Sequence, residues 1–317
     1  MPYKPSVRLN KEIAQNIIKN IDNYLFDCDG VIWNWPQPIQ GSVEFINKLK
    51  SLGKKCFFIT NNSTKTREKY VEMMKKIGIE KVDENDIVCT AWLLASYLKS
   101  IDFKHKVYVV GNTAMSYELD KQNIKHFGVG PNSERFKDIS SFDYVKSISL
   151  DEEVKCVAVG FDHHFNYPKM IEATSYAYKN SNCLFVATND DAVFPSGPDS
   201  KIVIPGTGTF VNAIKTSIGR DPIILGKPHP TMWKVLHSVH NLDPAKSIMF
   251  GDRLDTDIAF AANCDLAFSF AVLSGVTNEQ EIENYSKLLG VENANKDSLK
   301  LIPDFYANCL GDFEKLF

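Results

Sequence analysis

Short, almost uninterrupted apolar runs alternate with helical patterns along most of this chain. A strand with one face in water alternates polar and apolar residues, whereas a continuous apolar run is typical of a strand buried on both faces of a parallel sheet. The alternation therefore predicts an α/β fold with a doubly wound, Rossmann-like parallel sheet. We expect strands at 24–26, 55–59, 107–110, 155–159, 183–187, 222–225, 247–250 and 266–270.

Apolar stripes at helical spacing lie between these runs. One stripe extends from Val43 to Leu49 and is followed by Gly53, and another extends from Tyr70 to Ile77 and is followed by Gly78. A glycine just past the last apolar residue is a common helix end. An amphipathic stretch at 7–18 predicts a surface helix, to which we assign no further role.

The chain is too long for one ordinary core. Its 317 residues indicate two domains, or one domain that carries an insertion. The stretch from 106 to 215 has strands of its own and ends in turn-rich sequence, so we interpret it as an inserted α/β cap domain. The predicted organisation is a core made of 1–105 and 216–317, with the cap at 106–215 between its two parts.

Composition excludes several classes of protein. Thirty-nine acidic residues stand against 36 basic ones without long charged blocks, which disfavours a nucleic-acid surface. No apolar run reaches the length that spans a membrane, and the start of the chain does not read as a secretory signal. Seven cysteines include no C-x-x-C pair, and buried, reduced thiols are the expected state. We expect a cytoplasmic protein.

The first chemical signal is the pair Asp27 and Asp29 directly after the strand at 24–26. Side chains two apart in an extended chain point to the same side, so both carboxylates project from the carboxyl end of this strand, where open α/β sheets bind ligands. One ionised carboxylate can attack while its protonated neighbour serves as an acid. The alternative is a turn in which Asp and Gly30 supply only loop geometry.

A second acidic cluster follows the strand at 247–250. Asp252, Asp255 and Asp257 lie within six positions, and a hard cation takes oxygen ligands from more than one segment. The alternative is a helix start that Asp255 or Asp257 caps without any metal.

Two further strand ends carry polar groups. Thr60 and Asn61 open a run of small polar residues before a helix, a setting that suits a phosphate as well as a plain helix cap. Lys227 follows the strand at 222–225, where it could neutralise phosphate oxygens, although a lone lysine is usually a solvated surface charge. In a parallel sheet, all four strand ends would converge on one crevice.

This ordered set of four motifs resembles the haloacid dehalogenase superfamily of phosphotransferases. In detail it is similar to the eukaryotic group of 4-nitrophenylphosphatases, phosphoglycolate phosphatases and pyridoxal phosphatases. The matching segments are 27–33, 60–67, 251–258 and, in the inserted cap, 159–162, 187–191 and 205–208. The resemblance covers roughly residues 21–277.

The resemblance implies a role for each core residue. Asp27 would take the phosphoryl group as an aspartyl-phosphate, and Asp29 would protonate the leaving oxygen and later activate water. Mg²⁺ would be held by the Asp27 side chain, the Asp29 backbone carbonyl and Asp252, with Asp257 in support. Thr60 and Asn61 would hydrogen-bond the phosphoryl group, and Lys227 would balance its charge. These roles agree with the chemistry of phosphoryl transfer, which requires a nucleophile in line with the leaving group and positive charge to neutralise the phosphate oxygens.

The cap would then act as a lid that recognises the leaving group. Candidate specificity residues lie between 188 and 201, and include Asn189, Asp191 and Phe194. Phe194 stands where pyridoxal phosphatases carry a histidine before a proline, which places small acids such as 2-phosphoglycolate ahead of pyridoxal phosphate. Relatives suggest a homodimer joined through the caps.

The alternatives to a phosphatase of small metabolites are a phosphoprotein phosphatase and a non-catalytic metal- and phosphate-binding protein. Dehalogenase chemistry is disfavoured because it needs no acid at Asp29.

Overall fold

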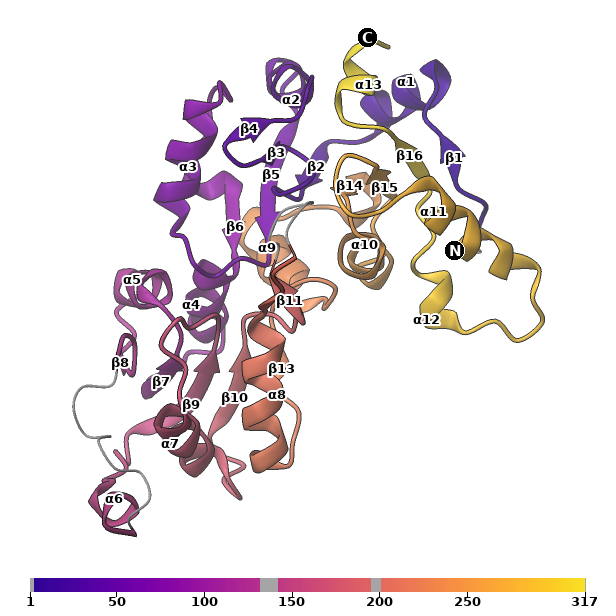
Figure 1. The fold of residues 1–317 in the computed structure, drawn as a ribbon. Coiled ribbons are helices and arrows are strands. Elements are labelled where there is room, and N and C mark those ends of the chain that lie inside the picture. The colour runs from indigo at the N-terminus through magenta and orange to yellow at the C-terminus, as the bar shows by residue number, and fades with distance from the viewer. Residues whose placement is uncertain (1–2, 132–141, 195–200, 317) are drawn as a thin grey trace. The chain divides into compact units, whose positions relative to one another are not determined.

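The chain folds into two compact units in the computed structural model, which describes residues 3–131, 142–194 and 201–316 (Figure 1). Unit 1 comprises residues 1–60, 67–88 and 227–317, and unit 2 comprises 61–66 and 89–226. The domain limits expected from the sequence, 1–105, 106–215 and 216–317, stay a prediction; by its contacts, unit 2 takes in the chain from 89 to 226. Each unit contains its own parallel sheet, which confirms the α/β class.

The sheet of unit 1 has seven strands in the order β1-β16-β15-β14-β2-β5-β6. The pairings from β1 to β5 along this order are all parallel. Strands β2 and β14 lie side by side and are buried throughout, as their continuous apolar sequences predict. The strands are β1 Val7–Arg8, β2 Asn23–Phe26, β5 Lys55–Thr60, β6 Ile87–Cys89, β14 Ser247–Gly251, β15 Phe268–Val272 and β16 Phe305–Ala307, with a separate hairpin of β3 Trp33–Asn34 and β4 Gln37–Pro38.

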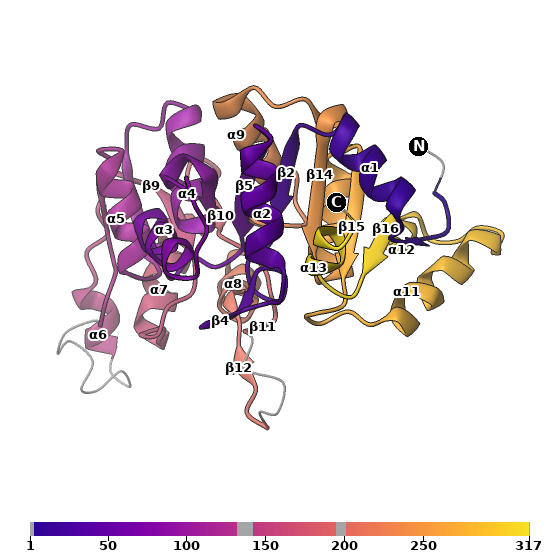
Figure 2. The same ribbon diagram turned by 90° about the horizontal axis from the view of Figure 1, so that it is seen from above.

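Helices cover both faces of this sheet (Figure 2). On one face, the ring of Phe250 lies 6.0 Å from that of Phe45 in α2 and 5.6 Å from that of Phe313 in α13. On the other face, Phe57 contacts His240 of α9 with ring centroids 4.8 Å apart. The aromatic layers fix the strands between the helices. The helices of unit 1 are α1 Lys11–Asn20, α2 Ser42–Ser51, α3 Arg67–Lys76, α9 Thr231–His240, α10 Ala259–Asn263, α11 Glu279–Ser286, α12 Lys296–Leu299 and α13 Gly311–Glu314.

Unit 2 is built on a five-stranded sheet in the order β13-β10-β9-β7-β8. All of its pairings are parallel. Tyr108, Val157, Phe185 and Ile214 are among the buried residues of the core between this sheet and its helices. The elements are α4 Thr90–Ser100, β7 Lys106–Val110, α5 Thr113–Lys121, β8 His126–Phe127, α6 Phe142–Ser147, β9 Val154–Val159, α7 Tyr167–Ala177, β10 Leu184–Ala187, β11 Val193–Phe194, β12 Ile204–Pro205, α8 Thr207–Ile218 and β13 Ile223–Ile224.

One predicted core strand lies in a different sheet. The strand expected at 222–225 is β13, which pairs with β10 in unit 2, through Val186 with Ile223 and Ala187 with Ile224. The apolar run indicates a buried parallel strand but carries no information about its neighbour. Lys227 is therefore not delivered by a strand of the unit 1 sheet. It is instead the first residue of the chain as it re-enters unit 1.

The two ends of the chain complete unit 1. Strand β1 pairs with β16, with Val7 opposite Phe305. Arg8 forms a salt bridge of 3.0 Å with Glu279 of α11 and stacks over the ring of Tyr306. The stretch at 7–18, expected to be one helix, is divided between β1 and α1. Neither β1 nor β16 was predicted, because such short strands depend on pairing with their neighbours, β1 with β16 and β16 with β15.

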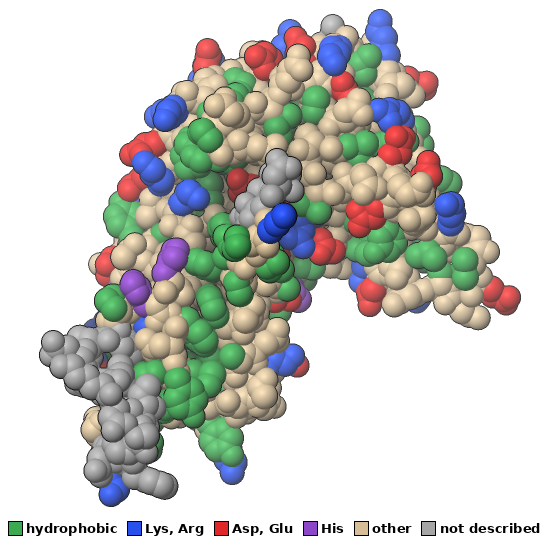
Figure 3. Space-filling model, in the orientation of Figure 1, with side chains coloured by type: hydrophobic (Ala, Val, Ile, Leu, Met, Phe, Trp, Pro, Cys, Tyr) green, Lys and Arg blue, Asp and Glu red, His purple; other side chains and the backbone are tan. Residues whose placement is uncertain are grey.

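The described cysteines are all free thiols, and each except the half-buried Cys309 is buried, in agreement with the sequence. Lysine and arginine side chains are interspersed with acidic ones on the face drawn in Figure 3, as the net charge of −3 leads one to expect. Within the described residues, we find no helix that combines the length and the apolarity needed to cross a membrane.

Candidate active site

Asp27 and Asp29 extend from the carboxyl end of β2. The backbone N–H of Asp27 donates to the carbonyl of Phe250 at 2.9 Å, so the sheet ladder with β14 still holds Asp27 in place. Gly30 then turns the chain with φ of +79°, a conformation that favours glycine. Asp27 is half-buried, whereas Asp29 is exposed. The two carboxylates thus have different surroundings, which is what two different chemical roles require.

The carboxylate of Asp29 is oriented by a tryptophan. The Nε1 atom of Trp33 donates to Oδ1 of Asp29 at 2.9 Å. Trp33 is completely buried and stacks on Tyr70 of α3 with ring planes 11° apart. The indole therefore has a fixed position, and it holds Asp29 at the start of the turn. The sequence motif includes Trp33, but sequence reasoning gave it no role.

Asp252 and Asp257 follow β14 and depend on glycines around them. The backbone N–H of Val276 donates to Oδ2 of Asp252 at 2.9 Å. A Cβ atom on Gly275 would lie 1.9 Å from that same oxygen, and a Cβ on Gly251 would lie 2.0 Å from Cβ of Asp257. Side chains at either glycine would displace the carboxylates. The Gly275–Val276 loop was missed, although a Ser-Gly pair soon after a predicted strand is a usable signal.

Asp257 is not a simple helix cap. It lies in a π-helical turn, Leu254–Ile258, and its Oδ2 accepts the backbone N–H of Arg253 at 3.1 Å. Its Oδ1 accepts from Nζ of Lys227 at 2.7 Å. By contrast, Asp255 is exposed and pairs with Arg253. Of the two acids considered as caps, only Asp257 faces the acidic cluster.

Lys227 joins the two acidic segments. Its Nζ donates to Oδ1 of Asp27 at 2.8 Å, to Oδ1 of Asp257 at 2.7 Å and to the carbonyl of Ile59 at 3.3 Å. The side chain is 2% exposed, so this lysine is not a solvated surface charge. A buried ammonium needs such partners, because removing it from water is costly.

Burial and the neighbouring charges shift the pKa values of the residues in this cluster. Burial, followed by repulsion from Asp27 and Asp257, raises the pKa of Asp252 to about 8. Burial also raises the pKa of Asp257 to about 6 and that of Asp27 above its usual value, although Lys227 opposes both shifts. Burial lowers the pKa of Lys227, but attraction to Asp257 and Asp27 outweighs it, and the net shift is upward. One buried ammonium thus compensates three carboxylates only in part.

The same three acids have the chemistry of a cation site. Asp27, Asp252 and Asp257 each offer a carboxylate oxygen within 4.8 Å of the others. An all-oxygen donor set suits a hard divalent cation, and the raised pKa values indicate a place where a cation would relieve repulsion. Because both oxygens of Asp257 already accept hydrogen bonds, Asp27 and Asp252 fit direct ligation better.

Thr60 and Asn61 stand at the end of β5. Thr60 is the last residue of this strand, is 4% exposed, and belongs to unit 1. Asn61 is the first residue of unit 2. Its carbonyl accepts from Oγ1 of Thr90 at 2.7 Å and from Nδ2 of Asn189 at 2.9 Å. The phosphate-binding motif expected from the sequence is therefore divided between the two units.

The three cap candidates lie in unit 2 after β10. Asn189 and Asp191 contact each other, with Nδ2 of Asn189 donating to Oδ2 of Asp191 at 2.9 Å. Phe194 is in β11, and its ring lies 5.3 Å from that of Phe161. Residues 195–200 of the expected specificity segment are outside the described part of the chain.

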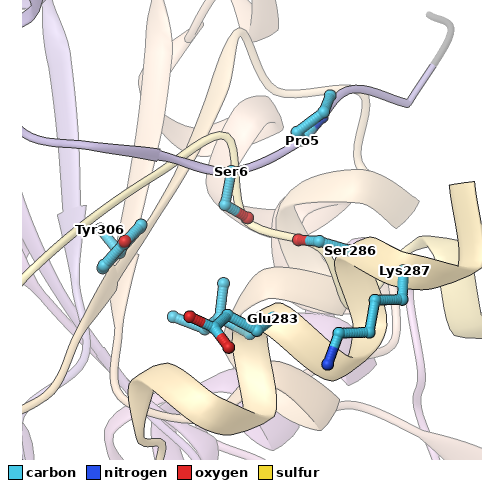
Figure 4. Close-up of a pocket in the computed structure, with 7 residues that line it drawn as sticks. Pro5, Ser6, Glu283, Ser286, Lys287 and Tyr306 are labelled. Carbon is cyan, nitrogen blue, oxygen red and sulfur yellow. The ribbon is translucent and has the colours of Figure 1, made fainter.

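A separate cavity lies at the chain ends of unit 1 (Figure 4). Its volume is about 320 Å³. Ser6 contributes from the N-terminal arm, Glu283 and Ser286 from α11, and Tyr306 from β16. The acidic cluster does not line it, and Oγ of Ser6 already donates to the carbonyl of Pro303 at 2.6 Å.

Comparisons with known proteins identify the family to which the chain is similar. A family model described as haloacid dehalogenase-like hydrolase matches residues 24–125, and a second, HAD-hydrolase-like model matches 224–293. Glycerol-3-phosphate phosphatase of Gallus gallus is 34% identical over 306 residues, which cover 96% of this chain and 95% of that protein. Phosphoglycolate phosphatase 1A, chloroplastic, of Arabidopsis thaliana is 35% identical over 304 residues, covering 95% and 79%.

Among solved structures, p-nitrophenyl phosphatase from Archaeoglobus fulgidus superposes with a TM-score of 0.75 and 26% identity, covering 94% of this chain and 100% of that one. The similarity extends beyond the residues 21–277 from which the sequence resemblance was drawn, since the match to the Gallus gallus protein covers 96% of this chain.

Proposed function

This chain belongs to the haloacid dehalogenase-like hydrolases, and we propose that it is a Mg²⁺-dependent phosphatase that hydrolyses small phosphomonoesters through an aspartyl-phosphate on Asp27. The observation that carries the proposal is the position of Lys227, buried between Asp27 and Asp257 with Asp252 in the same cluster. A half-buried nucleophile beside a buried ammonium and further carboxylates is suited to attack on an anion once a cation is present.

In the first step, an oxygen of Asp27 attacks phosphorus in line with the leaving oxygen. The bond between phosphorus and the leaving oxygen breaks, and Asp29 gives that oxygen a proton. The hydrogen bond from Trp33 keeps the carboxyl group of Asp29 in place for this transfer. Asp29 is exposed, so the water that returns this proton in the second step can reach it.

In the second step, the carboxylate of Asp29 takes a proton from water while the water oxygen attacks phosphorus. The bond to Asp27 breaks and inorganic phosphate leaves. The same residue thus acts as acid and then as base, which is the usual requirement when one group serves both half-reactions.

Mg²⁺ would be held by Asp27, Asp252 and the backbone carbonyl of Asp29, with Asp257 fixing the arrangement through Lys227 and Arg253. When bound, it supplies positive charge that lets a carboxylate approach a phosphate. Thr60 and Asn61 would hydrogen-bond the phosphoryl oxygens, and Lys227 would balance their charge.

We assign unit 2 the role of a cap that recognises the leaving group and excludes water. Of the three specificity candidates from the sequence, Asn189, Asp191 and Phe194, we retain Phe194 for this role; the first two contact Asn61 and are treated separately below. Because relatives are named as phosphatases of glycerol 3-phosphate, 4-nitrophenyl phosphate and phosphoglycolate, a small phosphorylated metabolite is the expected substrate. Assembly as a homodimer through this unit and a cytoplasmic location stay predictions.

Among small phosphomonoesters, 2-phosphoglycolate is our first choice, and glycerol 3-phosphate is the second because a relative is named for it. A phenylalanine at 194 disfavours pyridoxal phosphate. Purified protein should be assayed with these three compounds, a phosphopeptide and 4-nitrophenyl phosphate side by side. A phosphopeptide that is turned over faster than any metabolite would overturn the choice of substrate class.

The proposal itself is tested with Asp27→Asn. We expect this variant to lose hydrolysis of 4-nitrophenyl phosphate by about 10³-fold or more, because an amide cannot form the phosphoenzyme. The control is Asp255→Asn, which alters an exposed acid in the turn that contains Asp257. Unchanged turnover in the Asp27 variant would contradict the assigned nucleophile. Phosphate binding in the wild type without turnover of any phosphoester would favour the non-catalytic alternative.

A further inference from the structure

Asn61 is held by a set of hydrogen bonds within unit 2. Its backbone carbonyl accepts from Thr90 at 2.7 Å and from Asn189 at 2.9 Å. Its side-chain Nδ2 donates to Oδ2 of Asp191 at 3.1 Å. Both the backbone and the side chain of Asn61 are thus fixed by the short segment that follows β10.

Asn189 and Asp191 act as one unit. The same Nδ2 of Asn189 that donates to Asn61 also donates to Oδ2 of Asp191 at 2.9 Å. Oδ2 of Asp191 therefore receives two amides, one from each asparagine. A carboxylate that accepts two hydrogen bonds forms stronger ones than a neutral acceptor would.

The orientation of the Asn189 amide shows which contact matters. Asn189 is 6% exposed, and its Oδ1 is buried with no hydrogen-bond partner among the described residues. Rotating the amide by 180° would place that oxygen against two other acceptors, the carbonyl of Asn61 and the carboxylate of Asp191. The side chain therefore keeps its donor on Asn61 and leaves its acceptor unpaired, which is unfavourable for a buried group.

The same contacts reach the other side of Asn61. Its Oδ1 lies against Gly226, where a Cβ atom would approach it to 2.6 Å. Gly226 is fixed by a 2.9 Å hydrogen bond from its N–H to the carbonyl of Thr188. Chain continuity then connects Gly226 to Lys227, and Asn61 to Thr60. Thr60 and Lys227, two of the residues assigned to the phosphoryl site, are therefore covalently bonded to Asn61 and Gly226, which the segment after β10 holds in place.

We propose that Asn189 and Asp191 are positioning residues that fix Asn61 for phosphoryl binding, and not residues that select the leaving group. This inference rests on the proposed function, since it assumes that Asn61 contacts the phosphoryl group. Asn189 and Asp191 would then act on the phosphoryl group, which all phosphomonoesters share. Replacing either residue should lower the binding and turnover of every phosphomonoester to the same extent.

The test compares Asp191→Ala with Asp190→Ala, its exposed neighbour, and with Asp191→Asn, which keeps an acceptor in place. Inorganic phosphate is the binding probe, measured by calorimetry with Mg²⁺, because it has no leaving group. We expect Asp191→Ala to bind phosphate about 10-fold more weakly and to lose kcat/KM by about 10- to 100-fold. The loss should be equal for 4-nitrophenyl phosphate, 2-phosphoglycolate and glycerol 3-phosphate. Asp191→Asn should recover most of it.

Asn189→Ala serves as a second variant, and the unfolding of each protein by urea shows whether it is folded. Unchanged phosphate binding in a folded Asp191→Ala or Asn189→Ala variant, with kcat/KM altered for one substrate and not for others, would overturn the proposal. If the wild type turns over no phosphoester but binds phosphate, and Asp191→Ala binds it more weakly, the phosphatase function fails and the positioning role stands. A wild type that neither binds phosphate nor turns over any ester would overturn both.

Discussion

The ammonium of Lys227 donates a 2.8 Å hydrogen bond to the carboxylate of Asp27, which lies 200 positions earlier in the chain. The lysine is buried and the aspartate half-buried, and the contact is made at the point where the chain re-enters unit 1. It connects the first and last parts of this unit through the residue proposed as nucleophile. Removing one partner of such a pair leaves a buried charge without compensation.

We therefore expect Lys227→Met to reduce turnover of 4-nitrophenyl phosphate by about 10²- to 10³-fold, since both the phosphoryl group and Asp27 lose their neighbouring positive charge. Steady-state kinetics with saturating Mg²⁺ measures the effect. Lys234→Met, which alters an exposed lysine of α9, is the matched control. Turnover within about twofold of the wild type would rule out an electrostatic role for Lys227.

A second prediction concerns the hydrogen bond from Trp33 to Asp29. Trp33→Phe keeps an aromatic ring on Tyr70 but removes the donor. Because 4-nitrophenolate leaves readily without protonation, the variant should lose about 10-fold in kcat for glycerol 3-phosphate and much less for 4-nitrophenyl phosphate. Trp35→Phe, at an exposed neighbour, is the control. Equal losses for the two substrates would show that Trp33 does not act through the proton of Asp29.

A third prediction uses the close approach of Gly275 to Asp252. The Cβ atom of Gly275→Ala would lie 1.9 Å from Oδ2 of Asp252 and must displace this carboxylate. We expect a higher Mg²⁺ concentration for half-maximal activity and a loss of stability of about 1–3 kcal/mol. Gly290→Ala places its Cβ in open space and should change neither. A normal Mg²⁺ requirement in a folded Gly275→Ala variant would argue against Asp252 as a ligand.

The sequence predicts the α/β fold because its signals are local. Strands such as β2 and β14 are buried on both faces and are therefore mostly apolar, and Gly53, in the left-handed conformation, follows the end of α2. The partner of each strand is not a local property. The apolar run that forms β13 fits either sheet, and only the completed fold places it beside β10.

The same distinction applies to the candidate site. The acids at Asp27 and Asp252 could be located because each directly follows a buried strand, and β2 and β14 pair in parallel register. The hydrogen bond of Trp33 to Asp29 depends on the conformation of one turn, which residue types do not specify. Likewise, the contact between Asn61 and Asp191 joins positions 130 apart, and no spacing rule predicts it.

The last prediction concerns stability and pH. Burial, followed by repulsion from Lys55, lowers the pKa of His240, whose ring packs on Phe57. The folded state then binds a proton at His240 less readily than the unfolded state does. The contribution of neutral His240 to the free energy of unfolding is therefore full above about pH 6.5 and is lost as the pH falls through the pKa of the folded state. His240→Phe keeps an aromatic contact and should lose less stability than the wild type between about pH 7.5 and 5.0. Urea midpoints at both pH values measure this, with His105→Phe, at an exposed histidine, as control. An identical pH dependence in wild type and His240→Phe would refute it.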